Sequence, residues 1–257
     1  MDWCIARRLV DLNREFYQSF ASPFAQTRRS ARPGVGRLIA AIPPQVRILD
    51  LGCGSAPVLG LLAAQHHRGP YLGLDLSQPM LDLAEQGLSK PVSFPFLFQQ
   101  TDLFEPGWAQ RLAGPYECVL SFAFLHHIPS YPARLAFLRQ VHQVLNPAGD
   151  FLWSTWRLTR SPRLCSRILP WSVAGIPESE VEPGDYLLDW RQGGRGIRYV
   201  HEIDEAERIR LAQESGFEEC ETFASDGEQG NLSDYSVWSL PSGDRRSALS
   251  STRGPLT

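Results

Sequence analysis

The chain has no Cys-x-x-Cys pair, only one lysine and no long apolar run. Its cysteines are scattered through 257 residues, at Cys4, Cys53, Cys118, Cys165 and Cys220. This scatter argues against a zinc site and against a disulfide framework, because both need cysteines at characteristic spacings. We therefore expect no metal ion, and we expect Cys53 and Cys118 to be small buried side chains.

The chain also lacks the apolar segments that membranes require. No run approaches the roughly 20 apolar residues that span a bilayer. Asp2, Arg7 and Arg8 interrupt residues 1–10, so the apolar core of a signal peptide is missing there. A cytoplasmic protein without a membrane partner is the expectation.

Positive charge is almost entirely arginine, because Lys90 is the only lysine. The net charge is −3, yet arginines gather in residues 7–37 and 157–167, whereas acids gather in residues 178–228. Two basic zones on a mildly acidic chain are typical of a protein with an anionic partner such as RNA. The alternative is that arginine is simply the preferred cation and that these side chains are solvated.

Residues 46–56 predict a ligand-binding turn. The apolar run Val46–Leu51 contains one acid, Asp50, and breaks at Gly52 and Gly54. Apolar residues at helical spacing follow, so the order is strand, tight turn, helix, as at the start of a nucleotide-binding α/β domain. Glycines let the backbone turn sharply and approach a ligand. A plain structural turn has the same pattern, so the rest of the chain must decide.

Strands and helices alternate after this turn. Strands are predicted at 46–51, 71–75, 92–100, 116–122 and 151–156, and helices at 58–65, 78–87 and 133–145. Pro95 makes the third strand irregular. This rhythm predicts an α/β fold with a mostly parallel sheet covered by helices on both faces. Helices expected at 5–20 and 35–41 make residues 1–43 an N-terminal helical cap.

The alternation stops after residue 156. Residues 157–202 are rich in Pro and Gly and show no sustained period, which is typical of a lid inserted in a domain that spans residues 44–240. A helix at 204–215 and strands at 217–223 and 234–240 follow, and these strands can pair as an antiparallel hairpin. Residues 241–257 have the composition of a disordered tail.

Two cofactors fit this pattern, a nicotinamide dinucleotide and S-adenosylmethionine. Asp75 ends the second strand, where a carboxylate can accept hydrogen bonds from two ribose hydroxyls of either cofactor. Pro57 stands where the dinucleotide pattern has its third glycine, and a proline offers no N–H to a pyrophosphate. Together with Asp50 before the turn and the closing hairpin, Pro57 favours S-adenosylmethionine.

The run Ile48–Gly54, the acids Asp75 and Asp102 and the closing hairpin resemble class I S-adenosylmethionine-dependent methyltransferases over roughly residues 44–240. The resemblance implies a Rossmann-like sheet of about seven strands whose last pair is a reversed hairpin. It also implies that Asp75 binds the ribose and that Asp102 lies near the adenine. Ala56 departs from the family, which usually has a glycine there. The cofactor-binding residues implied are Asp50, Gly52, Cys53, Gly54, Ser55, Ala56, Asp75, Leu76, Asp102, Leu103, Ser121 and Phe122.

Further motifs are similar to those of the tRNA wobble-uridine carboxymethyl methyltransferases. These motifs are Tyr17-x-x-Phe-Ala-x-x-Phe-x-x-Thr-Arg28, Phe124-Leu-His-His-Ile, Tyr186-Leu-Leu-Asp-Trp190, Arg198-Tyr-Val-His201 and Gly230-Asn231. Asp189 stands where that family has a proline, and no tryptophan follows Arg28. The resemblance implies tRNA as substrate, a carboxylate as methyl acceptor and a small activating protein subunit.

The substrate-side candidates are Arg28, His126, Asp189, Trp190, Arg198, Tyr199 and His201. A carboxylate acceptor is already ionised at neutral pH, so it needs an anion clamp and no general base. Arg28 and Arg198 are candidates for the clamp because the guanidinium fork matches a carboxylate. Tyr199 and His201 are expected to shape the pocket, and Trp190 could stack on a base.

His126 and His127 are adjacent, and neighbouring side chains point apart, so one histidine is expected to line the pocket while the other packs. Two other functions stay open on the sequence alone. One is the same chemistry on a small molecule, with the arginines as incidental surface charges. The other is an inactive cofactor-binding partner subunit, which the departure at Ala56 keeps under consideration.

Overall fold

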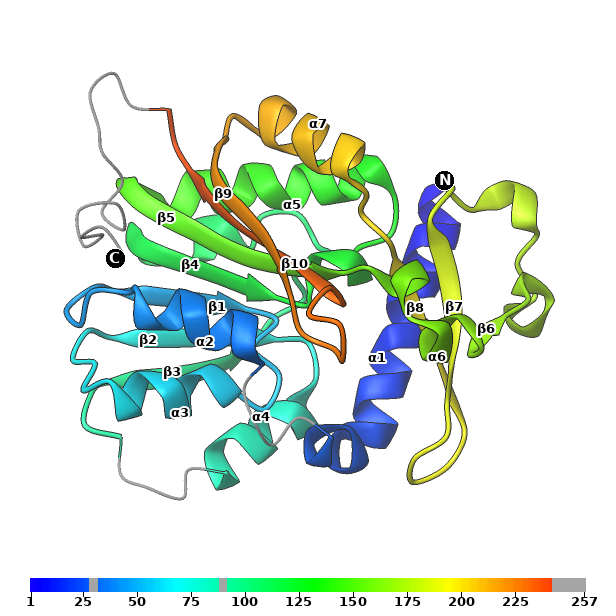
Figure 1. Ribbon diagram of the computed structural model, residues 1–257, viewed down its shortest axis with the longest axis horizontal. Coiled ribbons are helices and arrows are strands. Elements are labelled where there is room, and N and C mark those ends of the chain that lie inside the picture. The colour runs from blue at the N-terminus through cyan, green and yellow to red at the C-terminus, as the bar shows by residue number, and fades with distance from the viewer. Residues whose placement is uncertain (28–31, 88–91, 242–257) are drawn as a thin grey trace.

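The structure is a computed structural model that describes residues 1–27, 32–87 and 92–241. At its centre is a seven-stranded sheet in the order β3-β2-β1-β4-β5-β10-β9 (Figure 1). The strands are β1 (Ile48–Leu51), β2 (Tyr71–Asp75), β3 (Phe96–Gln100), β4 (Tyr116–Phe122), β5 (Leu145–Trp156), β9 (Glu218–Ser225) and β10 (Ser233–Ser239). The predicted tail from residue 242 lies outside the described residues.

The sheet confirms the predicted fold. Strands β1 to β5 pair in parallel, and β10 runs antiparallel to both β5 and β9. The closing pair is therefore an antiparallel hairpin whose second strand lies inside the sheet and whose first strand forms the edge. The parallel strands all end at the same side of the sheet, where open α/β folds bind their ligands.

Helices cover both faces of this sheet. One face carries α2 (Pro33–Ala40), α3 (Pro57–Ala64) and α4 (Gln78–Gln86), and the other carries α5 (Tyr131–Val144) and α7 (Glu205–Ser215). Successive residues of a strand point to opposite faces. Accordingly, Ile48 packs with α2 and α3, whereas Leu49 packs with α5 and α7.

The junction between α5 and β5 differs from the prediction. The sequence Asn146-Pro-Ala-Gly149 reads as a turn before a strand at 151, but β5 begins at Leu145, directly after the helix. Leu145 pairs with Tyr116 and Asp150 pairs with Cys118, so the residues between them bulge out of the ladder. The bulge explains why turn residues lie inside a strand.

The first helix, α1 (Trp3–Gln26), is longer than the predicted 5–20. It continues through Pro23 because the backbone kinks at Phe20, whose dihedral angles are not helical. Beyond the kink, Phe24 packs with Phe16 and Trp190. The helix thereby lies across the end of the large sheet and joins it to the inserted segment (Figure 1).

The inserted segment 157–202 is not irregular, contrary to the prediction. It holds a three-stranded antiparallel sheet of β6 (Ile168–Leu169), β7 (Asp185–Trp190) and β8 (Gly196–His201), with the short helix α6 (Pro162–Cys165) before it. Five short 3₁₀ turns complete the described elements, η1 (Ala109–Arg111), η2 (Leu125–His127), η3 (Leu158–Arg160), η4 (Trp171–Ala174) and η5 (Glu178–Glu180). Within the described ranges, no helix has the length and apolarity to cross a bilayer.

Candidate active site

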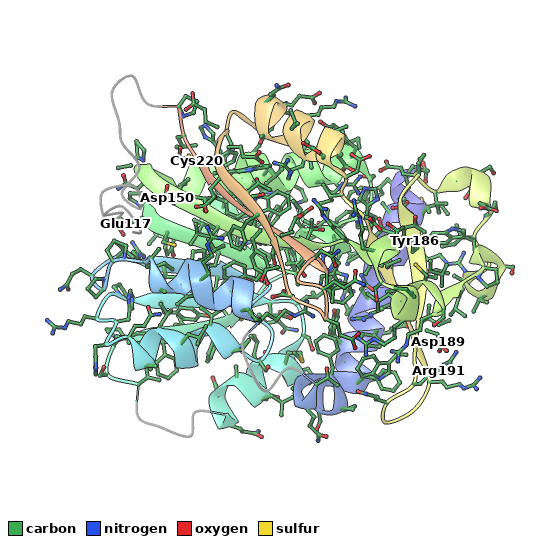
Figure 2. All side chains as sticks on the ribbon, in the orientation of Figure 1. Glu117, Asp150, Tyr186, Asp189, Arg191 and Cys220 are labelled. Atoms are coloured by element: carbon green, nitrogen blue, oxygen red, sulfur yellow. The ribbon has the colours of Figure 1, made fainter. Side chains whose placement is uncertain are left out.

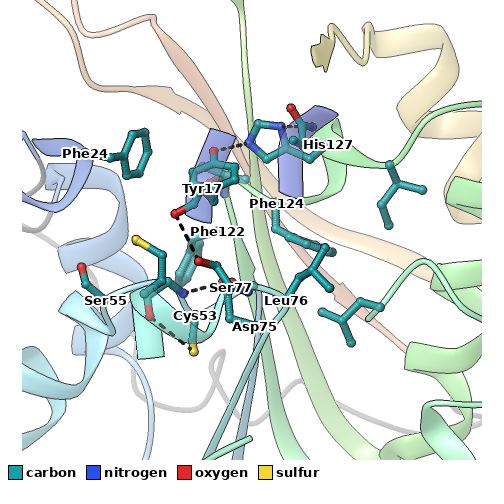
Figure 3. A pocket seen from close by; sticks show the side chains of 18 of the residues that line it. Tyr17, Phe24, Cys53, Ser55, Asp75, Leu76, Ser77, Phe122, Phe124 and His127 are labelled. Carbon is teal, nitrogen blue, oxygen red and sulfur yellow. Dashed lines mark hydrogen bonds between the residues drawn. The ribbon is translucent and has the colours of Figure 1, made fainter. Parts of the chain in front are cut away.

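A cavity of about 210 Å³ lies at the carboxyl ends of β1, β2 and β4. The glycine turn and Asp75 form its floor, residues 122–124 and His127 form one wall, and α1 contributes Asn13, Arg14, Tyr17 and Phe24. Figure 3 shows Tyr17 and His127 on one side of this space and Cys53, Asp75 and Ser77 on the other. The cavity therefore has a turn-lined side and an α1-lined side.

The turn after β1 is tight because its glycines adopt positive φ angles. Gly52 has φ +74°, and a side chain there would collide with the Phe124 ring, since an added Cβ would lie 2.3 Å from it. The backbone N–H groups of Gly52 and Cys53 donate to the carbonyl of Leu74 at 2.8 and 3.0 Å. Ala56 takes the left-handed conformation with φ +49°, which is slightly strained for alanine and unstrained for the glycine that the family usually has there.

Asp75 holds the turn to β2. Its carboxylate accepts hydrogen bonds from the backbone N–H of Gly54 at 2.8 Å and of Ser77 at 2.9 Å (Figure 3). Burial raises the pKa of Asp75 above its ordinary value, and these N–H donors act against that rise. A carboxylate has about four lone-pair sites, so Asp75 keeps acceptor capacity toward the cavity.

Asp102 is bound by two arginines of α1. Its Oδ2 atom lies 2.9 Å from Nη2 of Arg14 and 3.3 Å from Nη1 of Arg7, and its Oδ1 accepts from the N–H of Phe104 at 3.0 Å. The Ser77 hydroxyl donates to the carbonyl of Tyr17 at 3.2 Å. The helix α1 is therefore held against the cavity at two places, at Asp102 and at Ser77 beside Asp75.

Most of the predicted cofactor residues line this cavity. Those that do are Gly52, Cys53, Gly54, Ser55, Asp75, Leu76, Asp102, Leu103 and Phe122. Asp50, Ala56 and Ser121 are buried behind the lining. Asp50 accepts a hydrogen bond from the Tyr71 hydroxyl at 2.6 Å, and burial raises its pKa to about 7 against the effect of that hydrogen bond. The prediction that Asp50 lies at the ligand is therefore replaced by a role beneath the turn.

Thr101 was not predicted. Its hydroxyl is buried, lines the cavity between Asp75 and Asp102, and has no hydrogen-bond partner among the residues that the structure describes. An orphaned polar group in a cavity wall is a place where a polar ligand can bind. The row of Asp75, Thr101 and Asp102 suits a ligand with several hydroxyl and amino groups, such as an adenosyl group.

Tyr17 and His127 form a pair on the opposite side of the cavity. The Tyr17 hydroxyl lies 2.9 Å from Nε2 of His127 (Figure 3). Nδ1 of His127 lies 3.0 Å from the carbonyl oxygen of Tyr199. Because a carbonyl only accepts, Nδ1 carries the proton and Nε2 accepts from Tyr17. The Asn13 side chain bonds both the N–H and the carbonyl of Tyr199, which fixes the orientation of that carbonyl.

His127, and not the predicted His126, lines the cavity. His126 is fully buried against Trp156, and neither of its ring nitrogens has a hydrogen-bond partner within the described ranges. Burial lowers the pKa of His126 well below its ordinary value. The sequence placed one of two adjacent histidines in the site but could not tell which. The similarity of Tyr17 and His127 to the tRNA family was the signal that could have singled out this pair.

The remaining substrate-side candidates do not line the cavity. Tyr199 donates to Asp185 at 2.6 Å, and His201 lies 2.7 Å from both Asp185 and Glu207, so both side chains belong to a buried network instead of shaping the pocket. Asp189 pairs with Arg191 on the inserted sheet (Figure 2). Arg28 lies outside the described residues.

Trp190 and Arg198 lie one layer behind the cavity wall. Trp190 packs with Phe16 and Phe24 and donates from Nε1 to the carbonyl of Gln192 at 2.6 Å. Arg198 is buried next to Trp156 and Phe24, both of which do line the cavity. Neither side chain therefore meets the cavity directly.

Comparison with known proteins decides the family. A family model described as a methyltransferase domain matches residues 24–221, which is most of the chain. The chain belongs to this family. It is a class I S-adenosylmethionine-dependent methyltransferase. The cavity fits that cofactor, since its floor is a glycine turn and its wall is polar where the adenosyl group needs partners.

The curated relatives differ in how much of the chain they match. The methyltransferase relative YqeM of Bacillus subtilis is 31% identical, over 73% of this chain and 71% of its own length. Its name states no substrate. The tRNA (carboxymethyluridine(34)-5-O)-methyltransferases of Xenopus tropicalis and Arabidopsis thaliana are 26% and 25% identical, over 57% and 74% of this chain. The chain spans only 22% and 44% of the length of those two relatives.

Solved methyltransferase structures share the fold. A methyltransferase from Methanosarcina mazei superposes with a TM-score of 0.62 at 19% identity, covering 82% of this chain and 99% of that one. The magnesium protoporphyrin IX methyltransferase of Synechocystis, solved with bound S-adenosylhomocysteine, gives 0.61 at 16% identity over 90% and 99%. At such identities the likeness speaks for the fold alone.

Proposed function

We propose that this methyltransferase acts on tRNA. The proposal is supported by the names of the relatives in Xenopus and Arabidopsis and by the motifs around Tyr17 and His127. Exposed arginines of the inserted segment, Arg160, Arg163 and Arg195, suit a polyanionic substrate. The finer proposal is that the methyl acceptor is a carboxylate, as in a carboxymethyl-uridine.

Residues on the turn-lined side of the cavity would bind the cofactor, and residues on the α1-lined side would meet the methyl acceptor. Bound S-adenosylmethionine supplies an electrophilic methyl group on a sulfonium. The turn 52–55 and the carboxylate of Asp75 would hold the ribose, and Asp102 with Thr101 would hold the adenine. Methyl transfer is an in-line displacement, so rate comes mainly from alignment of the acceptor. Tyr17 and His127 lie on the side where an acceptor would enter.

The inserted sheet would act as the lid. It follows β5 at the ligand-binding edge, and β8 packs against α1, which forms the cavity's roof. Residues 1–43 would be a helical cap on a methyltransferase domain of residues 44–240. A small activating subunit and a cytoplasmic location stay predictions, as neither has a supporting observation in the structure.

The test is transfer of a tritiated methyl group from S-adenosylmethionine to two pools, bulk tRNA and a metabolite extract. We expect label in tRNA, and release of that label by mild alkali because a methyl ester hydrolyses where a methylated base or ribose does not. RNA binding should weaken steeply with salt. Label confined to the metabolites would contradict the tRNA proposal and favour a small-molecule acceptor. No label in either pool, with intact cofactor binding, would indicate an inactive subunit.

A further inference from the structure

Arg198 on β8 is a buried cation to which the described part of the chain brings no counter-ion. The residue is only 5% exposed. Its Nε and Nη1 atoms are buried, and neither has a hydrogen-bond partner among the described residues. Among the described residues, no aspartate or glutamate forms an ion pair with it. A buried charge is normally paired, because removing an ion from water carries a large free-energy cost.

Aromatic rings surround Arg198 in place of a carboxylate. Its guanidinium carbon lies 4.8 Å from the centre of the Trp156 ring and 5.6 to 5.7 Å from those of Phe16, Phe24 and Trp190. Such rings attract a cation through their π faces but neutralise no charge. Burial lowers the pKa of Arg198 from its ordinary value, and the Tyr17 hydroxyl partly opposes this.

Arg134 on α5 provides a comparison within the same chain. It is also completely buried, yet its Nε lies 2.7 Å from Glu207 and its Nη2 lies 2.9 Å from Glu182. Both arginines are buried, but among the described residues only Arg134 is paired with carboxylates. A structural role accounts for Arg134, since it ties α5 to α7 and to the inserted segment, but it does not account for Arg198.

Arg198 is separated from the cavity by one layer of side chains. Tyr17, Phe24 and Trp156 line the cavity on one side and face Arg198 on the other. Arg32, which lines the cavity, and Arg167 of the inserted segment are close enough to add further positive potential at Arg198. An anion entering the α1-lined side of the cavity would therefore be drawn toward this layer.

We propose that Arg198 is the receptor for the acceptor's carboxylate and that its aromatic surroundings keep it unpaired until the acceptor binds. The proposal rests on the methyltransferase activity and deepens the proposed function by assigning the residue that selects an anionic acceptor. The carboxylate would accept a hydrogen bond from one of the unsatisfied N–H groups, at Nε or Nη1, and a second one from the neighbouring Nη2. Movement of the Tyr17 and Trp156 side chains would open the way.

The first experiment compares the thermal unfolding of two matched variants, Arg198→Met and Arg134→Met. Methionine keeps most of the side-chain volume and removes the charge. Because no carboxylate of the described residues pairs with Arg198, Arg198→Met should raise the midpoint by about 2–10 °C. Arg134→Met should lower it, because Glu182 and Glu207 would lose their buried cation. An Arg198→Met protein that melts below the wild type would show that Arg198 is structural and would overturn the proposal.

The second experiment measures the melting midpoint of the wild type in sodium acetate, phosphate and chloride at equal ionic strength. A site for a carboxylate binds acetate and so raises the midpoint as acetate is added, and this rise should vanish in Arg198→Met. An equal rise in both proteins, or none in the wild type, would contradict the assignment. A rise with phosphate alone would mean an anion site of another specificity and would equally contradict it.

Calorimetry with S-adenosylmethionine completes the design, since Arg198→Met should bind the cofactor with unchanged affinity. Failure of the tRNA proposal appears as missing label in RNA, which leaves these anion measurements intact. Failure of the present proposal appears in the unfolding data, even if RNA is labelled. The two are therefore distinguishable.

Discussion

Asp50 and Asp75 illustrate how neighbouring strand residues with the same side chain take different roles. Both carboxyls are buried, but Asp75 accepts two backbone N–H groups at the cavity, whereas Asp50 accepts one phenolic hydroxyl beneath it. The sequence gives both acids the same expected role, and only the structure separates the acid that lines the cavity from the one that lies beneath it. Both side chains point to the same face of the sheet, so the difference depends on position along the strand, since Asp50 lies inside β1 and Asp75 is the last residue of β2.

Tyr71→Phe tests the supporting role of Asp50. Loss of the hydroxyl should lower the free energy of unfolding by about 1–3 kcal/mol, because Asp50 keeps no other hydrogen bond from a side chain. The folded pKa of Asp50 is raised, so its contribution is complete below its unfolded pKa of 3.8 and is lost as pH rises through about 7. Without the Tyr71 donor, that pKa rises further.

The cost of Tyr71→Phe should therefore be larger at about pH 8 than at about pH 5. Urea unfolding of both proteins at the two pH values measures it. A cost that does not change with pH, or that is larger in acid, would show that the carboxyl of Asp50 is not the group concerned.

The inserted sheet shows why one element escaped prediction from the sequence. Leu187 and Leu188 are consecutive and both buried, because Leu187 packs with Leu9 and Tyr199 while Leu188 packs with Trp156 and Val200. A strand covered on both faces has no alternation of polar and apolar residues, so the period of two disappears. The surrounding prolines and glycines then make the segment resemble a loop.

A buried network joins this inserted sheet to the helices of the main domain. His201 of β8 lies between Asp185 of β7 and Glu207 of α7, and Glu207 also binds Arg134 of α5. Burial alone would lower the pKa of His201, but its hydrogen bonds to Asp185 and Glu207 outweigh burial and raise it. Burial likewise raises the pKa of Glu207, and His201 and Arg134 outweigh it, so the pKa is lowered.

His201→Gln tests this network through pH dependence. The contribution of His201 is fully present below its unfolded pKa of 6.5 and is lost as pH rises through the higher folded value. That of Glu207 is present above its unfolded pKa of 4.5 and is lost as pH falls. The variant should lose about 1.5–3 kcal/mol of unfolding free energy between these values, and less in alkaline solution.

His66→Asn is the control, since His66 is exposed and its positive φ suits asparagine. Denaturant unfolding across the pH range gives both curves. His66→Asn should keep the pH dependence of the unfolding free energy of the wild type. If His201→Gln kept it too, the network would not link the inserted sheet to α5 and α7.

At the scale of the whole molecule, the sequence predicts the sheet, its covering helices and most residues of the turn-lined side of the cavity. These features depend on local signals, such as the glycine turn at Gly52 and the acid at Asp75, which fold geometry brings together automatically. The acceptor side is assembled from α1, η2 and β8, which are distant in sequence. Motifs contain Tyr17, His127 and Arg198 separately, but nothing local in the sequence shows that these three residues come together.

The same division applies to function. The family follows from the turn, the sheet and the matched domain, whereas the substrate depends on the assembled side. The motifs made Asp189 and His201 candidate substrate residues. In the structure, however, Asp189 pairs with Arg191, and His201 pairs with Asp185 and Glu207. Partner contacts in the fold, which a sequence does not display, decide which side chains stay available to an acceptor.

The central claim is that the cavity over Asp75 binds S-adenosylmethionine, and calorimetry of Asp75→Ala tests it most directly. Asp82→Ala, on the exposed side of α4, is the matched control. We predict that Asp75→Ala weakens binding at least about tenfold, since a charged hydrogen bond contributes roughly 1.5–3 kcal/mol, and that Asp82→Ala binds like the wild type. Unchanged affinity in a folded Asp75→Ala protein would contradict the account.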